Sequence, residues 1–269
     1  MPLIHASDGV NWKKKHLIAN PYIRIGLAFT AVVYLALALS SVEVNWVRVQ
    51  EGLGRGAAFV GSFLHPDFTS RWNEIFEGIL ESLTMTIVST ALGILLSIPV
   101  GIGAAGNIAP FPVYFLCRSI IAVSRTFPEV IIAIFFVAMF GFGALAGMLT
   151  LTFATIGFMA KLLAEDIEDI DPVQTEAIRS TGAGFFQMLT WSVQPQVMPR
   201  LIGLSVYRLD INFRESAVIG IVGAGGIGAT LNTSIDRYEY DTTAAILIVI
   251  IVIVMCAEYV SGIIRKRLQ

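Results

Sequence analysis

The sequence is poor in the residues that build metal sites, disulfide frameworks and charged surfaces. Its 269 residues include two cysteines and three histidines, and only 14% of them are charged, against roughly 25% in a typical soluble protein. Cys117 and Cys256 lie far apart in apolar surroundings, so neither a disulfide framework nor a zinc site is expected. The net charge of −2 gives no basic excess that would attract nucleic acid. We therefore expect no metal ion and no nucleic-acid partner.

Apolar residues, in contrast, make up 55% of the chain and give it a mean hydropathy of +0.75. A helix needs about 20 mostly apolar residues to cross a bilayer. We expect an all-α membrane protein with a cytoplasmic N-terminal segment, residues 1–21, and a transmembrane domain, residues 22–269. Its six transmembrane helices are expected near residues 22–42, 79–101, 114–140, 144–164, 200–222 and 242–264. The long polar lead before the first run favours a retained anchor over a cleaved signal peptide.

Lysine and arginine near the ends of the runs predict the orientation, because these residues accumulate on the cytoplasmic side. With the N terminus inside, four cations fall outside: Arg48, Arg55, Arg71 and Arg237. The inner side collects the larger set, which consists of Lys13, Lys14, Lys15, Arg118, Lys161, Arg179, Arg200, Arg265, Lys266 and Arg267. Both termini are therefore expected in the cytoplasm.

The stretch GAGGIGAT, residues 223–230, matches two nucleotide-binding patterns. Its glycines fit G-x-G-x-x-G, and the whole stretch fits a P-loop except that Ala229 stands in place of the lysine. A dinucleotide fingerprint joins a strand to a helix, whereas this stretch joins two apolar runs on the outer side. We expect Gly223, Gly225, Gly226 and Gly228 to form instead a turn that bends the backbone or lets a second subunit approach closely.

Charged residues within the apolar runs are functional candidates, because each costs on the order of 2.5 to 3.5 kcal/mol at the centre of a membrane helix. In the third run, Arg125 and Glu129 are four residues apart, which predicts that they share one helical face. The fifth run carries two polar stripes on opposite faces, with Arg208, Asn212 and Glu215 on one and Asp210 and Arg214 on the other. The spacing leaves open which stripe lines a pathway and which forms structural ion pairs.

The longest segment assigned to the inside, residues 165–199, is expected to contain two short helices. Asp171 is a good N-cap and Pro172 suits the first helical position, so one helix begins there and runs to about Ser180. Gly182 and Gly184 then end it. The second helix, residues 185–192, precedes Pro195 and Pro199, which return the chain to the membrane. Its aromatic residues form an apolar surface that indicates a partner protein or the lipid interface.

Glu176, Ala177 and Gly182, with Pro195 thirteen residues on, resemble the E-A-A-x3-G-x9-I-x-L-P loop by which permeases of bacterial ABC importers dock onto their ATPase subunits. Ile178 stands in place of the second alanine, and Ser192 and Gln194 stand in place of the isoleucine and leucine. Residues 207–228, YRLDINFRESAVIGIVGAGGIG, extend the likeness. In combination, these stretches resemble the phosphonate-type importer permeases and, in the glycine-rich part, their methionine-importing relatives.

The resemblance implies the fold of a methionine- or phosphonate-type ABC importer permease in the bacterial inner membrane. It also implies a second copy of the chain, two cytoplasmic ATPase subunits that carry MgATP, and an extracytoplasmic substrate-binding protein. The chain itself then needs no cofactor and no catalytic residues. The expected coupling residues are Glu176, Ala177, Arg179, Gly182 and Phe185. The expected pathway or gate residues are Arg125, Glu129, Arg208, Asn212, Arg214 and Glu215.

Two other functions compete with an importer of phosphonate or a related phosphorus oxyanion. One is the permease of a related ABC importer for another small solute such as methionine. The other is an autonomous secondary transporter, for which Glu129 beside Pro128 would be the coupling carboxylate in a broken helix. A membrane enzyme is disfavoured, because no nucleophile with an adjacent histidine occurs in the chain.

Overall fold

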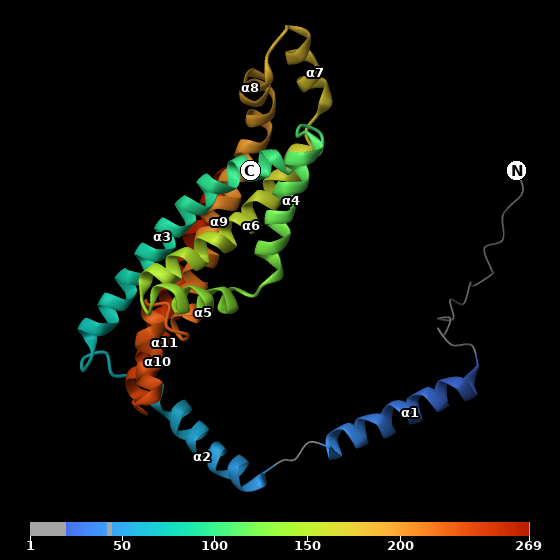
Figure 1. The fold of residues 1–269 in the computed structure, drawn as a ribbon. Helices are drawn as coiled ribbons and strands as arrows, with labels where there is room; N and C mark the ends of the chain where they lie inside the picture. The colour runs from blue at the N-terminus through green and yellow to red at the C-terminus, as the bar shows by residue number, and fades with distance from the viewer. Residues whose placement is uncertain (1–19, 42–44, 269) are drawn as a thin grey trace, which may run out of the picture. The chain divides into compact units, whose positions relative to one another are not determined.

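The computed structural model describes residues 20–41 and 45–268, and within these ranges it contains helices and no strand (Figure 1). The predicted cytoplasmic segment lies outside the described residues up to residue 19. The helices are α1 Pro21–Ser40, α2 Trp46–Ser62, α3 Trp72–Gly103, α4 Phe111–Thr126, α5 Glu129–Phe140, α6 Ala144–Glu168, α7 Pro172–Ser180, α8 Phe185–Met188, the π-helical turn η1 Leu189–Val193, α9 Gln194–Gly220, α10 Ile227–Asp236 and α11 Tyr240–Leu268.

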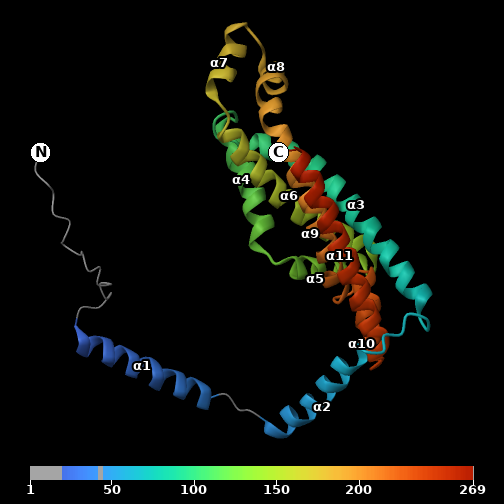
Figure 2. The same cartoon turned by 180° about the vertical axis from the view of Figure 1, so that it is seen from behind.

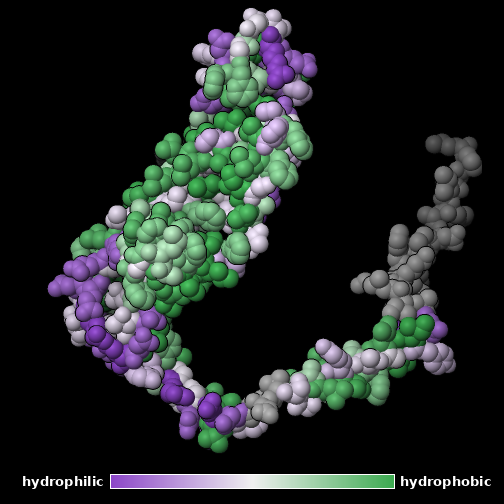
Figure 3. Space-filling view, in the orientation of Figure 1, coloured by the Kyte–Doolittle hydropathy of each residue, from purple (hydrophilic) through white to green (hydrophobic). Residues whose placement is uncertain are grey.

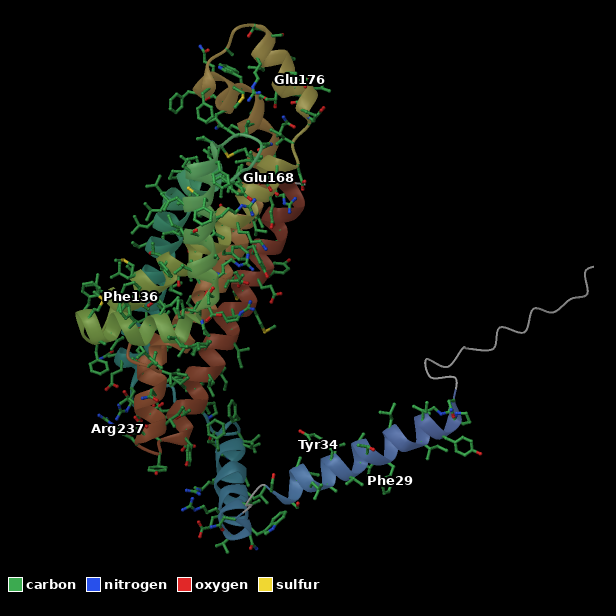
Figure 4. All side chains as sticks on the ribbon, turned by 45° about the vertical axis from the view of Figure 1, so that its right-hand side comes forward. Phe29, Tyr34, Phe136, Glu168, Glu176 and Arg237 are labelled. Carbon is green, nitrogen blue, oxygen red and sulfur yellow. The ribbon has the colours of Figure 1, made fainter. Side chains whose placement is uncertain are left out.

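The chain divides into two units, residues 1–56 and 57–269. In the first unit, the predicted first run forms α1. Asn20 caps this helix, since its Oδ1 accepts the N–H of Tyr22 at 3.0 Å, and Pro21 fills the first helical position, which needs no donor. No residue of α1 is buried within its unit, and aromatic side chains such as Phe29 and Tyr34 point outward (Figure 4). A helix that is apolar all round is suited to a lipid environment.

The second unit is a helical bundle whose centre is formed by α3, α6 and α9. Small residues let α3 and α6 approach closely: a Cβ added at Gly93 would stand 2.5 Å from the Cβ of Thr155. Towards the end that carries α7, Met159 and Leu163 of α6 are buried against Val197 of α9. Seen from behind, α11 runs alongside α9 and ends at the same end of the bundle as α7 and α8 (Figure 2).

The third predicted run is not one straight helix, because the chain bends by 94° between α4 and α5. Proline has no N–H and forces the preceding residue out of the α region. Phe127 is accordingly extended, with a φ of −94° and a ψ of 133°, and Pro128 precedes the first residue of α5. Arg125 lies in the last turn of α4 and Glu129 begins α5, so the prediction that they share one helical face is wrong.

Four helices in the described part of the chain are long and apolar enough to cross a membrane, namely α1, α3, α6 and α11, and the bent pair α4–α5 would make a fifth. The remaining predicted run, 200–222, is helical within α9, but its charges keep it outside this set. The short helices α2 and α10 are additional to the prediction. Hydrophobic residues cover the middle of the second unit, and hydrophilic residues gather at its two ends (Figure 3).

Candidate functional site

A buried polar cluster joins the three central helices of the bundle. Asn212 of α9 is fully buried, and its Nδ2 donates to Thr90 Oγ1 of α3 at 2.7 Å and to Thr155 Oγ1 of α6 at 2.9 Å. Arg208, one turn earlier, donates from Nε to the same Thr155 oxygen at 3.1 Å. Since a buried polar group is costly unless it is paired, this cluster fixes how α9 lies against its neighbours.

Arg208 is 4% exposed, and its charge is balanced by Glu129, the first residue of α5, with an N–O distance of 3.0 Å. The guanidinium carbon lies 5.3 Å from the centre of the Phe158 ring, which is within the range of a cation–π interaction. The carboxyl groups of Glu129 and Glu215 interact directly. The predicted stripe of Arg208, Asn212 and Glu215 therefore meets the start of α5. There the carboxyl groups of Glu129 and Glu215 lie close to the guanidinium of Arg208.

The opposite face of α9 carries the second predicted stripe. Arg214 donates to Asp210 Oδ2 at 2.9 Å across one turn. Asp210 is buried, whereas the Arg214 side chain is 53% exposed. An arginine that is half exposed on a helix of the bundle indicates that water or a further protein surface covers it.

Arg125 lies apart from both stripes, on α4. Its Cγ lies against α6, 3.3 Å from the position that a Cβ would take at Gly157. Arg125 is exposed, and no ion pair involves it among the residues that the structure describes. The structure thus places Arg125 and Arg208 beside consecutive residues of α6, Gly157 and Phe158, although Arg125 is not paired with Glu129.

The glycine-rich stretch forms a tight turn from α9 into α10. Gly223, Gly225 and Gly226 have φ values of 94°, 81° and 72°, which favour glycine. Gly228 faces the backbone of Ala217, where a Cβ would collide. These contacts lie within the chain, so the glycines bend the backbone and pack α10 against α9.

The N terminus of α10 is already occupied by side chains of α3. Glu81 Oε2 accepts the N–H of Gly226 at 2.9 Å, and Ser82 Oγ accepts the N–H of Ile227 at 2.9 Å. In a nucleotide-binding loop, a phosphate would take this position. With a carboxylate of the chain in that place and a helix instead of a strand before it, the turn is a packing element.

The predicted coupling segment stands beyond the apolar body of the bundle. Asp171 Oδ1 accepts the N–H of Val173 at 3.0 Å, and α7 ends at Ser180, so the predicted cap and bounds of this helix are confirmed. Gly182 follows with a φ of 81°. Glu176 lies on α7, near the projecting end (Figure 4). Ala177 and Arg179 are also exposed.

The second predicted short helix differs from the prediction at its end. Residues 185–188 form α8, the π-helical turn η1 follows, and the chain continues into α9 at Gln194 without a break. Pro195 is the second residue of α9 and directly follows the π-helical turn. The segment therefore reaches the bundle as one almost continuous helix, and Pro199 lies inside it.

An apolar surface is exposed on this projecting hairpin. Phe186 is 80%, Trp191 71% and Val173 67% exposed, and Phe185 is exposed beside Phe186. Ser192, which stands where the importer motif has isoleucine, is buried and shares a hydrogen bond of 2.9 Å with Thr175 Oγ1. This hydrogen bond joins α7 to η1, so the serine that departs from the motif stabilises the hairpin.

A charged junction at the base of the hairpin was not predicted. Glu168 Oε1 accepts from Arg118 Nη2 at 2.8 Å and from the N–H of Gly106 at 2.7 Å, and Arg118 Nε donates to the carbonyl of Ala104 at 2.9 Å. Glu168 lies below Glu176 where α6 ends (Figure 4). The junction fixes the α3–α4 connection to the last turn of α6. Sequence spacing gives no sign of it, because Glu168 is 50 residues from Arg118 and 62 residues from Gly106.

A protein-family model described as "Binding-protein-dependent transport system inner membrane component" matches residues 97–269. The chain belongs to this family. The matched region includes the central polar cluster except Thr90, the glycine-rich turn and the projecting hairpin. The predicted recognition of the chain as an importer permease is thereby confirmed.

Among its relatives, the permease is 41% identical over 246 residues to the phosphate-import permease protein PhnE of Mycolicibacterium smegmatis, an alignment that covers 91% of this chain and 46% of that protein. It is 36% identical over 262 residues to the phosphite transport system permease protein PtxC of Stutzerimonas stutzeri, with 97% and 92% covered. The chain thus spans about half the length of the first relative and most of the second.

Solved structures share the fold of the permease. A chain of the MetNI methionine ABC transporter, in inward-facing conformations, has a TM-score of 0.63 at 22% identity and covers 75% of this chain and 100% of its own. A chain of an amino acid ABC transporter with histidines has a TM-score of 0.61 at 19% identity, with 75% and 98% covered. Over the residues that the structure describes, the permease therefore has the helical fold of these ABC transporter chains.

Proposed function

We propose that this chain is the membrane-spanning subunit of an ATP-driven importer and forms the translocation pathway for phosphonate or a related phosphorus oxyanion. The observation that carries the proposal is the hairpin of α7 and α8, whose aromatic surface extends beyond the apolar body of a transport permease. The substrate class is supported by the two relatives described above, which are named for phosphate and phosphite import.

The distribution of charge supports an orientation with the hairpin in the cytoplasm. Arg118, Lys161, Arg179 and Arg200 lie towards the hairpin end, and basic residues accumulate on the cytoplasmic side of membrane proteins. The opposite end, where Arg237 is found (Figure 4), is rich in carboxylates, including Asp67, Glu74, Glu239 and Asp241. In this orientation α1, α3, the α4–α5 pair, α6, α9 and α11 make six spans, and both termini are cytoplasmic.

Coupling to ATP hydrolysis is assigned to the hairpin. Glu176, Ala177 and Arg179 on α7, with Gly182 and Phe185 at the turn, present the surface that a cytoplasmic ATPase would clasp. Two such ATPase subunits carry MgATP, and this chain needs no cofactor, since the glycine-rich turn that resembles a phosphate loop is filled by Glu81. Movement of α7 reaches the bundle through both α6 and α9, which directly flank the hairpin.

The translocation pathway is assigned to the charged faces of α9 and the helices opposite them. Arg208, Asn212 and Glu215 meet Glu129 of α5 on one side, and Arg214 is half exposed on the other. Arg125 adds a guanidinium without an ion pair among the described residues. A second copy of the chain would complete the pathway between the two permeases, and an extracytoplasmic binding protein would deliver the substrate. Alternating access then requires these ion pairs to exchange partners.

A permease for another solute, such as methionine, is the second candidate, because the MetNI chain shares the fold. The charge of the site separates the two: the described arginines offer bidentate partners for an oxyanion. An autonomous secondary transporter is less well supported, because it has no use for the exposed aromatic surface of the hairpin.

Uptake of phosphite, phosphate and methylphosphonate into proteoliposomes that contain the permease, its ATPase and its binding protein tests the proposal. We expect ATP-dependent uptake of at least one of these anions, and its loss in Glu176→Ala and in Gly182→Pro while both variants still insert and assemble. Normal uptake by both variants would show that the hairpin does not couple ATP hydrolysis to transport.

A further inference from the structure

Helix α5 is a short element with a break in helical structure, here called a joint, at each end. At its start, Phe127 is extended and Pro128 supplies no N–H, so no helical hydrogen bond from that residue crosses the 94° bend. At its end, Gly141 and Gly143 have φ values of 87° and 131°. A Cβ at either glycine would meet nothing within 4 Å, but the N–H of Gly143 donates to the carbonyl of Gly223 at 3.0 Å, so the second joint lies at Gly141. The 12-residue helix is thus separated from α4 and α6 by two breaks in helical structure.

One charged contact holds the start of this helix to the centre of the bundle. Glu129 is the first residue of α5, and its carboxylate is 3.0 Å from Arg208 Nη2. Arg208 is fixed independently of α5, because Nε donates to Thr155 and the guanidinium lies over Phe158, both on α6. If α5 moves, the carboxylate of Glu129 moves with it, while the guanidinium of Arg208 keeps its place against α6.

The guanidinium of Arg208 is then a receptor for an oxyanion. Carboxylates and phosphorus oxyanions both present pairs of oxygen atoms that match the planar fork of donors on arginine. Glu215 lies beside Glu129, but among the described residues the ion pair of Arg208 is with Glu129. The Cγ of Arg125 lies against Gly157, the residue before Phe158 on α6.

We propose that Glu129 is an internal competitor for the transported oxyanion: in this conformation its carboxylate occupies Arg208, and a movement of α5 about its two joints frees the arginine for the substrate. This inference rests on the proposed function, which supplies the oxyanion. It assigns to Glu129 the control of substrate access and to Arg208 the contact with substrate.

The test is binding of radiolabelled phosphite and phosphate to the purified permease–ATPase complex in nanodiscs, without the binding protein. Removal of a competitor that occupies the site in about 90 to 99% of molecules lowers the apparent Kd about 10- to 100-fold. We expect this gain in Glu129→Gln, and we expect it to disappear in the double variant with Arg208→Gln. Arg208→Lys, which keeps the charge but not the fork, should retain only part of it. Glu74→Gln, which breaks an arginine ion pair of 2.9 Å at the outer end, is the matched control and should bind as the wild type does.

Unchanged or weaker binding in Glu129→Gln overturns the inference, and so does a gain that survives in the double variant. If the wild-type complex with its binding protein takes up none of the three anions, the proposed function fails and the inference with it. Uptake by the wild type with no gain in Glu129→Gln overturns the inference alone.

A distance measurement tests the movement without relying on a change at Arg208. Spin labels at Ile134→Cys on α5 and Ile202→Cys on α9, both exposed, are placed in a chain whose Cys117 and Cys256 are replaced by alanine. Saturating phosphite and the Glu129→Gln change should each shift the distance distribution in the same direction. A distribution that neither perturbation alters contradicts a moving α5.

Discussion

Truncation of Asn212 gives the most direct measure of how strongly the central cluster holds the bundle. Its Nδ2 makes one hydrogen bond to α3 and one to α6, and interhelical hydrogen bonds in membranes contribute about 0.6 kcal/mol each on average. Removal of the carboxamide leaves a void of roughly 25 Å³, which adds about 0.6 kcal/mol at about 24 cal/mol per Å³. The partner hydroxyls keep their own acceptors, the carbonyls of Thr86 and Leu151 at 2.6 Å, so no further loss arises there. We expect Asn212→Ala to lower the free energy of unfolding by about 2 kcal/mol.

The assay is unfolding of the purified permease by sodium dodecyl sulfate in mixed micelles, followed by circular dichroism. Thr84→Ala is the control, because Thr84 is exposed and its hydroxyl bonds only to the carbonyl of Leu80 in its own helix. This variant should stay within about 0.5 kcal/mol of the wild type. If Asn212→Ala is as stable as Thr84→Ala, the cluster does not hold the three helices together and the reasoning is refuted.

Two further changes test the packing and the junction in the same assay. Gly93→Ala places a methyl group 2.5 Å from Thr155, so it should lower the free energy of unfolding by about 1 to 3 kcal/mol. The control Gly203→Ala, with nothing within 4 Å, should be neutral or stabilising. Equal stability of the two variants would contradict the close α3–α6 contact. Glu168→Gln keeps an acceptor for the N–H of Gly106 but loses the charge opposite Arg118. Both side chains of this ion pair are about one-third exposed, so the change should lower the free energy of unfolding by less than about 1 kcal/mol. The loss should be smaller still at high salt. A larger, salt-independent loss would show that the junction acts through packing and not through charge.

The length of the apolar runs was enough to locate the main helices, because a lipid-facing helix must be apolar over most of its length. The bounds of α7 also followed from local chemistry, since Asp171, Pro172 and Gly182 act through their own backbone neighbours. Local rules of this kind depend on a few adjacent residues, and a single sequence contains them in full.

The bend at Pro128 shows where such reasoning was insufficient. The third run contains Pro128, but the apolar residues on both sides of it favoured a single helix. In the structure Phe127 is extended and α5 turns away by 94°. Because the helix is broken between them, the four-residue spacing of Arg125 and Glu129 does not place them on one face. The true partner of Glu129 is Arg208, 79 residues away, and only the packing of α5 against α9 brings the two together.

The same limit applies to contacts that cap or join distant elements. Glu81 occupies the N terminus of α10 from 145 residues away, and Glu168 accepts hydrogen bonds from Gly106, which precedes α4, and from Arg118 on α4. The short helices α2 and α10 escaped prediction because neither has an apolar run of membrane length. Each of these features depends on tertiary packing, which a pattern of residue types does not specify.

The measurement that tests the central claim most directly is purification of the permease from its native membrane in mild detergent, identification of the proteins that accompany it, and assay of MgATP hydrolysis. We predict that an ATPase with a complete P-loop co-purifies and that hydrolysis rises when a binding protein loaded with a phosphorus oxyanion is added. A permease that purifies alone and still moves solute across liposome membranes would contradict the account.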